Sequence, residues 1–306
     1  MNIVSSADDG YVPHFAAMLH SAWLYHRDAN FYLLDAGISK ANVTLLERFA
    51  EQRSIRLTIF PVKDRLAAIG GAANHPAYAR LLIPDLLEAE RGLYLDCDII
   101  VLGDLSELYL TKLDGFAFAA RPDGSEVSFK FEGELTGAPF TREDYFNSGV
   151  MLMDLPRWRH ERISSRVFEF VEAFPKKLPT ADQTALNCVI LANYRKIGQQ
   201  WNCFRNHELL EHPAPRILHY IFDKAWTRSD SPFWEVYRFH RNQTPWPISH
   251  SPKPRYGLLR RLRYRIGAKL GNKRMRKQIE HFRIEDLVET TIVKPAISRA
   301  SRFLNT

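Results

Sequence analysis

The sequence predicts an α/β fold built on a largely parallel sheet with helices on its faces. Short apolar runs typical of strands alternate with segments of helical apolar spacing over the first sixty residues, as in parallel strands joined by crossover helices. The 306 residues are 45% hydrophobic and 25% charged, which suits a large globular domain with an appendage rather than a disordered chain. No stretch approaches the roughly 18 apolar residues of a membrane-spanning helix.

The first three strands and the two helices between them are predicted in strict alternation. Asp8-Asp9-Gly10 is a turn sequence that ends the first strand, and Ser39 is a suitable N-cap for the second helix. Apolar residues recur at helical spacing in the helices and in continuous short runs in the strands. We expect strands over 2–7, 31–34 and 55–60, and helices over 12–26 and 40–49.

The later elements are predicted from the same signals. Four more short apolar runs indicate strands, and two longer segments have helical spacing. No internal repeat or low-complexity segment precedes residue 250. We expect strands over 92–95, 99–102, 116–120 and 150–154, and helices over 158–174 and 182–193.

Basic residues are concentrated at the C-terminal end of the chain. The net charge is +7, but residues 253–306 carry 15 Lys and Arg against 4 Asp and Glu, so residues 1–252 have a net charge of −4. Several prolines between 245 and 254 mark the change in composition. We predict a mildly acidic domain over 1–250, which carries the chemistry, and a basic helical segment over 251–306.

The basic segment contains a predicted amphipathic helix. Leu258, Leu262, Ile266 and Leu270 recur every fourth residue, with arginines between them. Docking on an anionic membrane surface is the interpretation we favour for residues 253–306, because polybasic segments are attracted to anionic lipid. Packing of the apolar stripe on the main domain is one alternative. Nucleic-acid binding is another, but no recognised nucleic-acid fold supports it, and no nucleic-acid partner is expected.

Cysteine usage indicates a reducing compartment. Cys97, Cys188 and Cys203 are an odd number, are widely spaced and form no Cys-x-x-Cys pair, which excludes a disulfide scaffold or a cysteine-rich zinc module. The first residues lack the basic start and apolar run of a signal peptide. We therefore expect a cytoplasmic protein that is peripheral on the inner face of the cell membrane.

Two acids, Asp96 and Asp98, stand between two predicted strands, and we expect the chain to turn at Cys97. The apolar flanks give this turn a low-dielectric setting, in which neighbouring carboxylates need a compensating cation. A hard divalent metal that also binds a diphosphate supplies that compensation. A strand-end turn with solvated acids is the alternative, since this spacing is common by chance.

Other polar residues stand where predicted strands end or helices begin. No glycine-rich phosphate loop follows the first strand, so a bound nucleotide needs another group to neutralise its phosphates. Each candidate also has a purely structural explanation: a turn residue, a charge at a helix N-terminus, a core histidine or a solvated lysine. The candidates are Asn147, Asp182, Gln183, His219 and Lys224.

Taken together and in order, these segments resemble glycosyltransferase family 8, whose members include bacterial lipopolysaccharide galactosyl- and glucosyltransferases and glycogenin. The resemblance covers residues 1 to about 230, and the order of eight motifs makes it far more specific than any one of them. The motifs are Ala7-Asp8-Asp9-x-Tyr11, Leu34-Asp35-Ala36-Gly37, Tyr78-Ala79-Arg80-Leu81, Tyr94-Leu95-Asp96-x-Asp98, Asn147-Ser148-Gly149-Val150, Asp182-Gln183, Trp201-Asn202 and His219-Tyr220 with Lys224-x-Trp226.

The resemblance implies a GT-A fold and a metal-dependent, retaining transfer of galactose or glucose from a UDP-hexose to a cell-surface glycan or glycolipid such as lipopolysaccharide core. Mn²⁺, or Mg²⁺, would be bound by Asp96, Asp98 and His219. Gln183 and Asp182 would lie at the reacting face. The resemblance implies that uridine is bound by Ala7, Asp8 and Tyr11, and the diphosphate by Arg80 and Lys224. The sugar would be bound by Asn147, Asp182 and Gln183. Cys97 and Ser148 are further donor-binding positions, next to the metal and sugar residues.

The sequence departs from the family pattern at two places. The family has a glycine three residues after the histidine, where this chain has Phe222, and one residue fewer precedes Lys224. The usual donor-sugar aspartate is not evident between residues 121 and 146, where Asp123 is a candidate.

Retention of configuration has two possible routes. A covalent route needs a carboxylate under the anomeric carbon, and the matching position holds Gln183. Front-face attack is therefore favoured, while the neighbouring Asp182 keeps the covalent route open.

Two other functions stay open as alternatives: a metal-dependent nucleotidyltransferase or phosphohydrolase, and a non-catalytic basic membrane adaptor.

Overall fold

The computed structural model describes residues 1–70, 74–123, 133–137, 141, 143–174, 178–204, 215–221, 224–227, 233–248, 258–274, 276 and 289–305. In chain order, its strands are β1 (Asn2–Ala7), β2 (Asn30–Asp35), β3 (Arg56–Pro61), β4 (Arg91–Leu95), β5 (Ile99–Val101), β6 (Phe118–Pro122), β7 (Phe146–Asp154), β8 (Arg195–Lys196) and β9 (Ile217–His219). Its α-helices are α1 (Val12–Tyr25), α2 (Lys40–Gln52), α3 (Lys63–Ile69), α4 (Ile83–Leu86), α5 (Ser106–Tyr109), α7 (Leu155–His160), α8 (Ile163–Ala173), α9 (Asp182–Ile190), α11 (Trp234–Asn242), α12 (Leu258–Lys269) and α14 (Lys294–Leu304). Short 3₁₀ turns are η2 (Pro76–Leu82), η3 (Gln199–Trp201) and η4 (Ala225–Thr227), and η5 (Glu289–Val293) is a π-helical turn.

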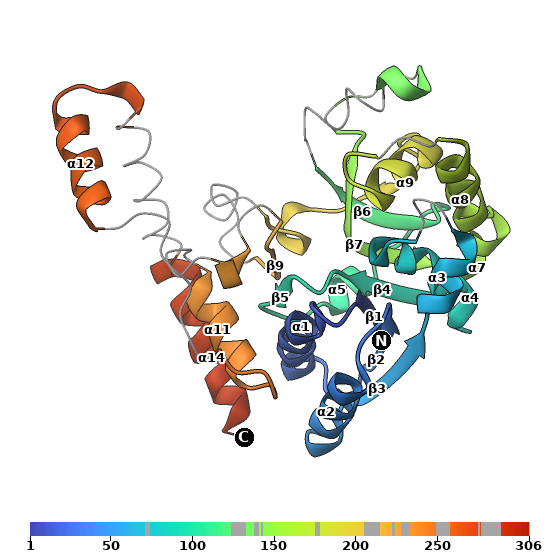
Figure 1. Cartoon of the computed structure of the whole chain (residues 1–306), viewed down its shortest axis with the longest axis horizontal. Helices are drawn as coiled ribbons and strands as arrows, with labels where there is room; N and C mark the ends of the chain where they lie inside the picture. The colour runs from blue at the N-terminus through green and yellow to red at the C-terminus, as the bar shows by residue number, and fades with distance from the viewer. Residues whose placement is uncertain are drawn as a thin grey trace.

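A seven-stranded sheet in the order β3-β2-β1-β4-β7-β6-β8 forms the centre of the molecule (Figure 1). β1, β2, β3 and β4 are parallel, as are β6 and β8, and β7 is antiparallel to both of its neighbours. The expected mixed, mostly parallel sheet is therefore confirmed. Reversal of direction at β7 brings the β6–β7 pair beside the carboxyl end of β4, where polar side chains gather.

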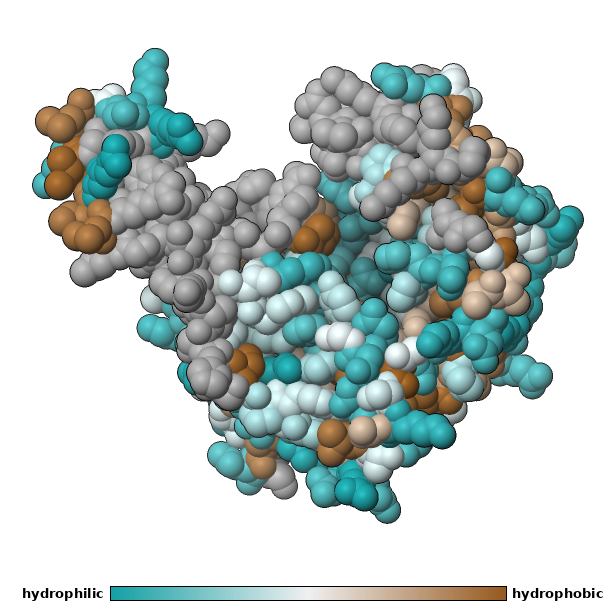
Figure 2. Space-filling model, in the orientation of Figure 1, coloured by the Kyte–Doolittle hydropathy of each residue, from teal (hydrophilic) through white to brown (hydrophobic). Residues whose placement is uncertain are grey.

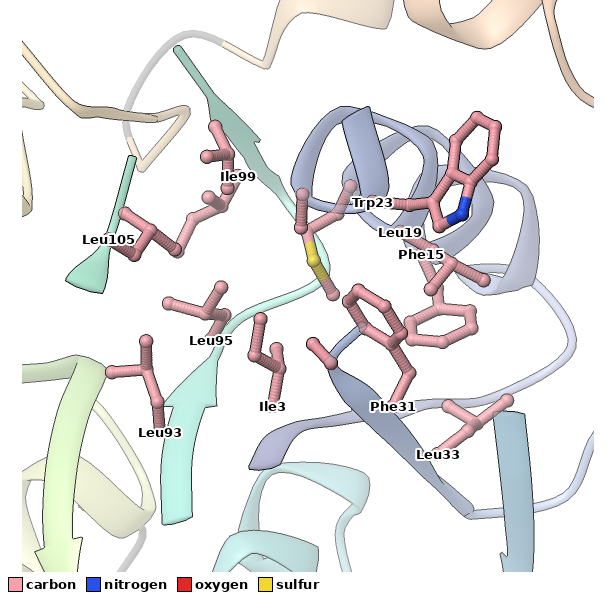
Figure 3. Close-up of a cluster of buried hydrophobic side chains, with 14 of the residues drawn as sticks. Ile3, Phe15, Leu19, Trp23, Phe31, Leu33, Leu93, Leu95, Ile99 and Leu105 are labelled. Atoms are coloured by element: carbon pink, nitrogen blue, oxygen red, sulfur yellow. The ribbon is translucent and has the colours of Figure 1, made fainter. Parts of the chain in front are cut away.

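The sheet separates two hydrophobic cores because successive side chains of a strand point to opposite faces. Ile3 and Leu93 pack with α1 and α2 on one face, whereas Val4 and Tyr94 pack with η2, α7, α8 and α9 on the other. Figure 3 shows the first core, in which Phe15, Leu19 and Trp23 of α1 lie over the strands. Both faces of the central strands are buried, which explains their continuous apolar runs.

A smaller layer lies beside the main sheet. β5 and β9 form an antiparallel pair, and a third apolar cluster joins them to α1, α11 and the segment around α14 (Figure 1). In α14, Ala296 is buried in this cluster and Ala300 in the first core, and small residues of this kind let two helices approach closely. Part of the predicted basic segment is therefore held against the main body, and the domain boundary at residue 250 stays a prediction.

Most predicted elements are present, with two differences. The helix expected over 158–174 is two helices, α7 and α8, separated at Arg162, whose φ of 53° is left-handed and breaks the helix. The strand expected from Val150 begins four residues earlier, at Phe146, because buried polar residues continue the ladder. Within the described residues, no helix is both long enough and apolar enough to cross a bilayer.

Candidate active site

Two adjoining cavities lie at the carboxyl ends of β1 and β4, the edge where ligands bind in open α/β sheets. One, of about 320 Å³, lies beside the β1–α1 turn, and the other, of about 270 Å³, lies toward β7 and α9. Arg80, Asp96 and Asp98 line both. The first cavity is also lined by Ala7, Asp8, Tyr11 and Cys97, and the second by Asp123, Asn147, Ser148, Asp182, Gln183, His219 and Lys224. Every residue predicted to bind donor or metal therefore lines one of the two.

The turn between β4 and β5 places the two acids at the junction of the cavities. β4 ends at Leu95 and β5 begins at Ile99, so Asp96 and Asp98 lie in the turn that the sequence predicted. β9 pairs with β5 and brings His219 opposite Ile99. One ligand atom from each of Asp96, Asp98 and His219 lies within 4.8 Å of the others. Two carboxylates and an imidazole suit a divalent cation such as Mn²⁺.

Asp96 uses its two carboxylate oxygens differently. Oδ1 accepts hydrogen bonds from Arg80 Nη2 and from the Tyr94 hydroxyl, both at 2.8 Å. Oδ2 lies 3.6 Å from His219 Nε2 and faces the space between the three residues. The first oxygen is therefore held by the protein, and the second is directed toward the candidate metal position.

Asp98 lies between two basic groups. Oδ1 is 3.0 Å from His219 Nε2, and Oδ2 accepts a hydrogen bond from Lys224 Nζ. Burial would raise the pKa of Asp98, but the facing His219 and Lys224 hold it well below its ordinary value. Burial lowers the pKa of Lys224, and attraction to Asp98 outweighs this effect, so the net shift is upward. The pair is charged at neutral pH.

Arg80 bridges the two cavities from η2. Its guanidinium donates to Asp96, pairs with Asp182 Oδ2 at 3.0 Å through Nε, and donates to the Ser148 carbonyl oxygen at 2.6 Å. The guanidinium also lies over the Tyr94 ring, 4.5 Å from its centroid. Burial lowers the pKa of Arg80, and the two carboxylates raise it by more. A buried, fixed cation beside the metal position suits a diphosphate.

Asp182 is the buried acid at the start of α9. Its Oδ2 accepts a hydrogen bond from the Ser148 hydroxyl at 3.2 Å in addition to the pairing with Arg80. Burial raises the pKa of Asp182 to about 6, against the lowering effect of Arg80. The sequence placed Asp182 beside the donor sugar, and the structure places it on the wall of the second cavity.

Amide side chains form the wall opposite the metal position. Asn147 Nδ2 donates to Gln183 Oε1 at 3.0 Å, and Gln183 Nε2 donates to Asp123 Oδ2 at 3.1 Å and to the Tyr145 hydroxyl at 2.9 Å. Gln183 Oε1 also accepts from the Ser148 backbone N–H at 3.1 Å. Asp123, which was only a candidate from sequence, thus belongs to this wall.

Gly149 separates the amide wall from the metal position. A Cβ at residue 149 would lie 2.2 Å from His219 Cε1 and 2.6 Å from Asp96 Oδ2. Only glycine leaves room for these side chains to converge, which gives a physical reason for a glycine at this position of β7.

The first cavity begins at the turn before α1. The Tyr11 backbone N–H donates to Asp8 Oδ1 at 3.0 Å, and the Tyr11 side chain is 40% exposed. Its ring meets Trp226 edge-on at a centroid distance of 6.2 Å, and Trp226 stacks on His14 at 3.6 Å. This exposed ring, held at its edge by other aromatics, offers a face to a flat base.

Sequence reasoning gave no role to several residues that the structure brings into or behind the site. Tyr94 and Asn202 belong to two of the family motifs. Each is a polar residue within an apolar segment, and this pattern could have indicated a role in the site. His14 has no comparable signal because it meets Trp226 across more than two hundred residues. The Phe222 departure lies outside the described residues.

Comparison with known proteins decides the family. The family model for glycosyl transferase family 8 matches residues 2–230, which covers β1 through the candidate site. The chain belongs to glycosyltransferase family 8. Its transferase domain thus coincides with the part of the chain that lines both cavities.

Several relatives of this family 8 glycosyltransferase are similar along most of its length. General stress protein A of Bacillus subtilis is 28% identical over 282 residues, covering 82% of this chain and 96% of its own. The lipopolysaccharide 1,2-glucosyltransferase of Escherichia coli K12 is 23% identical over 267 residues, covering 80% and 79%. The crystal structure of galactosyltransferase LgtC with donor and acceptor sugar analogs superposes with a TM-score of 0.67 at 23% identity, covering 81% and 98%. The GT-A-type fold is thereby confirmed.

Proposed function

We propose that this glycosyltransferase moves a hexose from a UDP-sugar to a cell-surface glycan acceptor, with retention of configuration and with a divalent metal. The observation that carries the proposal is the convergence of Asp96, Asp98 and His219 at the junction of two cavities. One cavity, with Tyr11 at its mouth, suits the nucleoside, and the other, with its amide wall, suits the sugar. The diphosphate then lies at the metal position.

The reaction requires stabilisation of the negative charge that develops on the leaving nucleotide. A bound Mn²⁺ or Mg²⁺ would supply Lewis-acid stabilisation of the departing diphosphate. Arg80 and Lys224 add fixed positive charge on the two sides of the acids, without any proton transfer. Ala7, Asp8, Tyr11 and Cys97 would hold the nucleoside half.

The amide wall would orient the sugar. Asn147, Asp182 and Gln183 face the second cavity and offer donors and acceptors to sugar hydroxyls. The contacts of Asp182 with Arg80 and Ser148 hold its carboxylate in the wall, which favours orientation over nucleophilic attack. Gln183 is a poor nucleophile, so front-face attack within a tight ion pair is the route that we propose.

The test is a panel of UDP-sugars incubated with MnCl₂ or MgCl₂, with UDP release as the readout. We expect metal-dependent UDP release with a UDP-hexose, increased by a glycan acceptor. Pyrophosphate in place of UDP would identify a nucleotidyltransferase, and no turnover with any donor would favour the non-catalytic adaptor.

We also propose that α12 attaches the enzyme to an anionic membrane surface on the cytoplasmic side. Leu259, Leu262, Ile266 and Leu270 are 83%, 51%, 52% and 81% exposed. Figure 2 shows these apolar side chains gathered with hydrophilic ones on a helix that projects from the body. Exposed apolar groups beside Arg263, Arg265 and Lys269 suit a lipid surface, where a glycolipid acceptor is found.

A further inference from the structure

Asn202 lies at the point where the metal side and the sugar side of the site meet. It follows η3, and its relative exposure is 0%. The next residue, Cys203, is bridged to β9: its N–H donates to the Ile217 carbonyl at 3.0 Å, and its carbonyl accepts from the His219 N–H at 2.8 Å. Arg121 Nη1 donates to the Asn202 carbonyl oxygen. The Asn202 side chain is therefore fixed in place beside His219.

The hydrogen bonds around Asn202 assign its amide atoms. The Gly149 backbone N–H, which can only donate, donates to Asn147 Oδ1 at 3.0 Å. The Asn202 atom that contacts the same oxygen at 2.8 Å must also be a donor, which identifies it as Nδ2. The other amide atom of Asn202 is then Oδ1, which lies 2.9 Å from His219 Nδ1.

This assignment sets the tautomer of His219. An amide oxygen only accepts, so Nδ1 of His219 must carry the hydrogen that it shares with Asn202 Oδ1. In the neutral ring that a metal requires, the lone pair then belongs to Nε2, whereas without a metal a hydrogen on Nε2 would be shared with Asp98 Oδ1. Nε2 is the nitrogen that faces Asp98 Oδ1 at 3.0 Å and Asp96 Oδ2 at 3.6 Å, so the ring is oriented to bind a metal.

We propose that Asn202 is a positioning residue that presents Nε2 of His219 to the metal and, through the same amide, holds the donor-sugar residue Asn147. The inference rests on the proposed function, because it concerns the metal and sugar of that reaction. Its consequence is that the two halves of the site share one rigid link: the oxygen of Asn202 serves the metal ligand, and its nitrogen serves the sugar wall.

Two variants separate these halves. Asn202→Leu has nearly the same size but neither polar atom, so His219 loses its acceptor, and we expect Mn²⁺ affinity in the presence of UDP to fall by about 10- to 100-fold. Asn202→Asp keeps an oxygen for His219 Nδ1–H but opposes Asn147 Oδ1 with a second oxygen. We expect it to keep Mn²⁺ affinity within about threefold while the KM for the UDP-sugar rises.

The measurements are titration calorimetry with MnCl₂ and UDP, and pulsed electron paramagnetic resonance of bound Mn²⁺, which detects a coordinated imidazole nitrogen. The nitrogen signal should weaken in Asn202→Leu and persist in Asn202→Asp. Asn187→Leu is the matched control: Asn187 is an equally buried amide that bonds to Phe146 and the Gln183 carbonyl and does not contact His219. It should lower stability and leave the nitrogen signal intact.

A folded Asn202→Leu protein with unchanged Mn²⁺ affinity and nitrogen signal would overturn the inference while leaving the proposed function intact. So would loss of the nitrogen signal in Asn202→Asp, which provides the test if the Leu variant does not fold. A wild-type protein that binds no Mn²⁺ with UDP would overturn the proposed function as well.

Discussion

The candidate pocket and helix α12 both concentrate charge, but they arrange it in opposite ways. In the pocket, acids and bases alternate at hydrogen-bond distance, with Arg80 between Asp96 and Asp182. Helix α12 has basic residues and no acid, and its described charged side chains are exposed. Charges that face each other inside a buried site fix the geometry of that site. Charges that face outward act on a partner, so the difference separates chemistry from attachment.

The largest expected effect is loss of the metal position. Asp98→Asn removes a ligand and the partner of both His219 and Lys224, so metal-dependent UDP binding should fall by at least about 100-fold. Calorimetry with MnCl₂ and UDP measures this. Asp85→Asn, which changes an exposed acid near Arg65, is the control and should bind as wild type does. Unchanged Mn²⁺-dependent UDP affinity in Asp98→Asn would contradict the metal assignment.

The pH dependence of stability tests how deeply the pocket charges are buried. The pKa of Asp182 is raised to about 6, so the folded protein favours the protonated acid, and the stability due to this group is highest below pH 4 and falls as the pH rises to 6. Asp182→Asn lacks this titration. The free energy of unfolding of wild type relative to Asp182→Asn should therefore decrease by about 2 kcal/mol between pH 4 and pH 7. Denaturant melts at several pH values measure it, and parallel curves would contradict it.

Substitution of Gly149 tests by steric crowding alone whether the metal position and the sugar wall have to lie this close together. Because a Cβ would collide with His219 and Asp96, Gly149→Ala should weaken Mn²⁺-dependent UDP binding by about tenfold or more and destabilise the fold by about 1–3 kcal/mol. Gly92→Ala is a matched control on β4, where the new Cβ would meet its nearest neighbours at 3.8 Å, an ordinary contact. Equal effects of the two substitutions would show that the crowding at residue 149 is relieved at little cost.

Substitutions on the exposed face of α12 should reduce membrane binding and leave the chemistry of the pocket unchanged. Replacing Leu259, Leu262 and Ile266 together by Ser should reduce binding to phosphatidylglycerol vesicles by about tenfold or more. UDP release with a soluble acceptor should be unchanged, because these side chains are exposed and make no part of the pocket. Binding of the wild-type protein should also weaken with added salt. Deleting residues 253–306 is a poorer test, since it removes the buried residues of α14.

Sequence predicted the local features and missed the links between distant segments. The turn at Asp96 and Asp98 was predictable because two short apolar runs flank it. The family resemblance supplied Arg80 and the role of His219 as a metal ligand, since no local pattern brings η2 and β9 to that turn. The roles of Asn202 and His14 depend on pairing between segments that are far apart in the chain. α14 was missed because its buried face consists of alanines, which give a weak apolar signal.

The packing of α1 under α11 and α14 bears on how the chain folds during synthesis. α1 is made among the first residues, yet it is covered by helices that end more than two hundred residues later, and Arg27 just after it donates to the Phe303 carbonyl at 2.8 Å. A nascent chain can pair β1, β2 and β3 early, while one side of α1 stays uncovered until α14 has left the ribosome. This interval exposes apolar surface of the kind that makes partly folded chains prone to aggregation. Because contacts between distant residues are slow to form, docking of α14 should come late in folding.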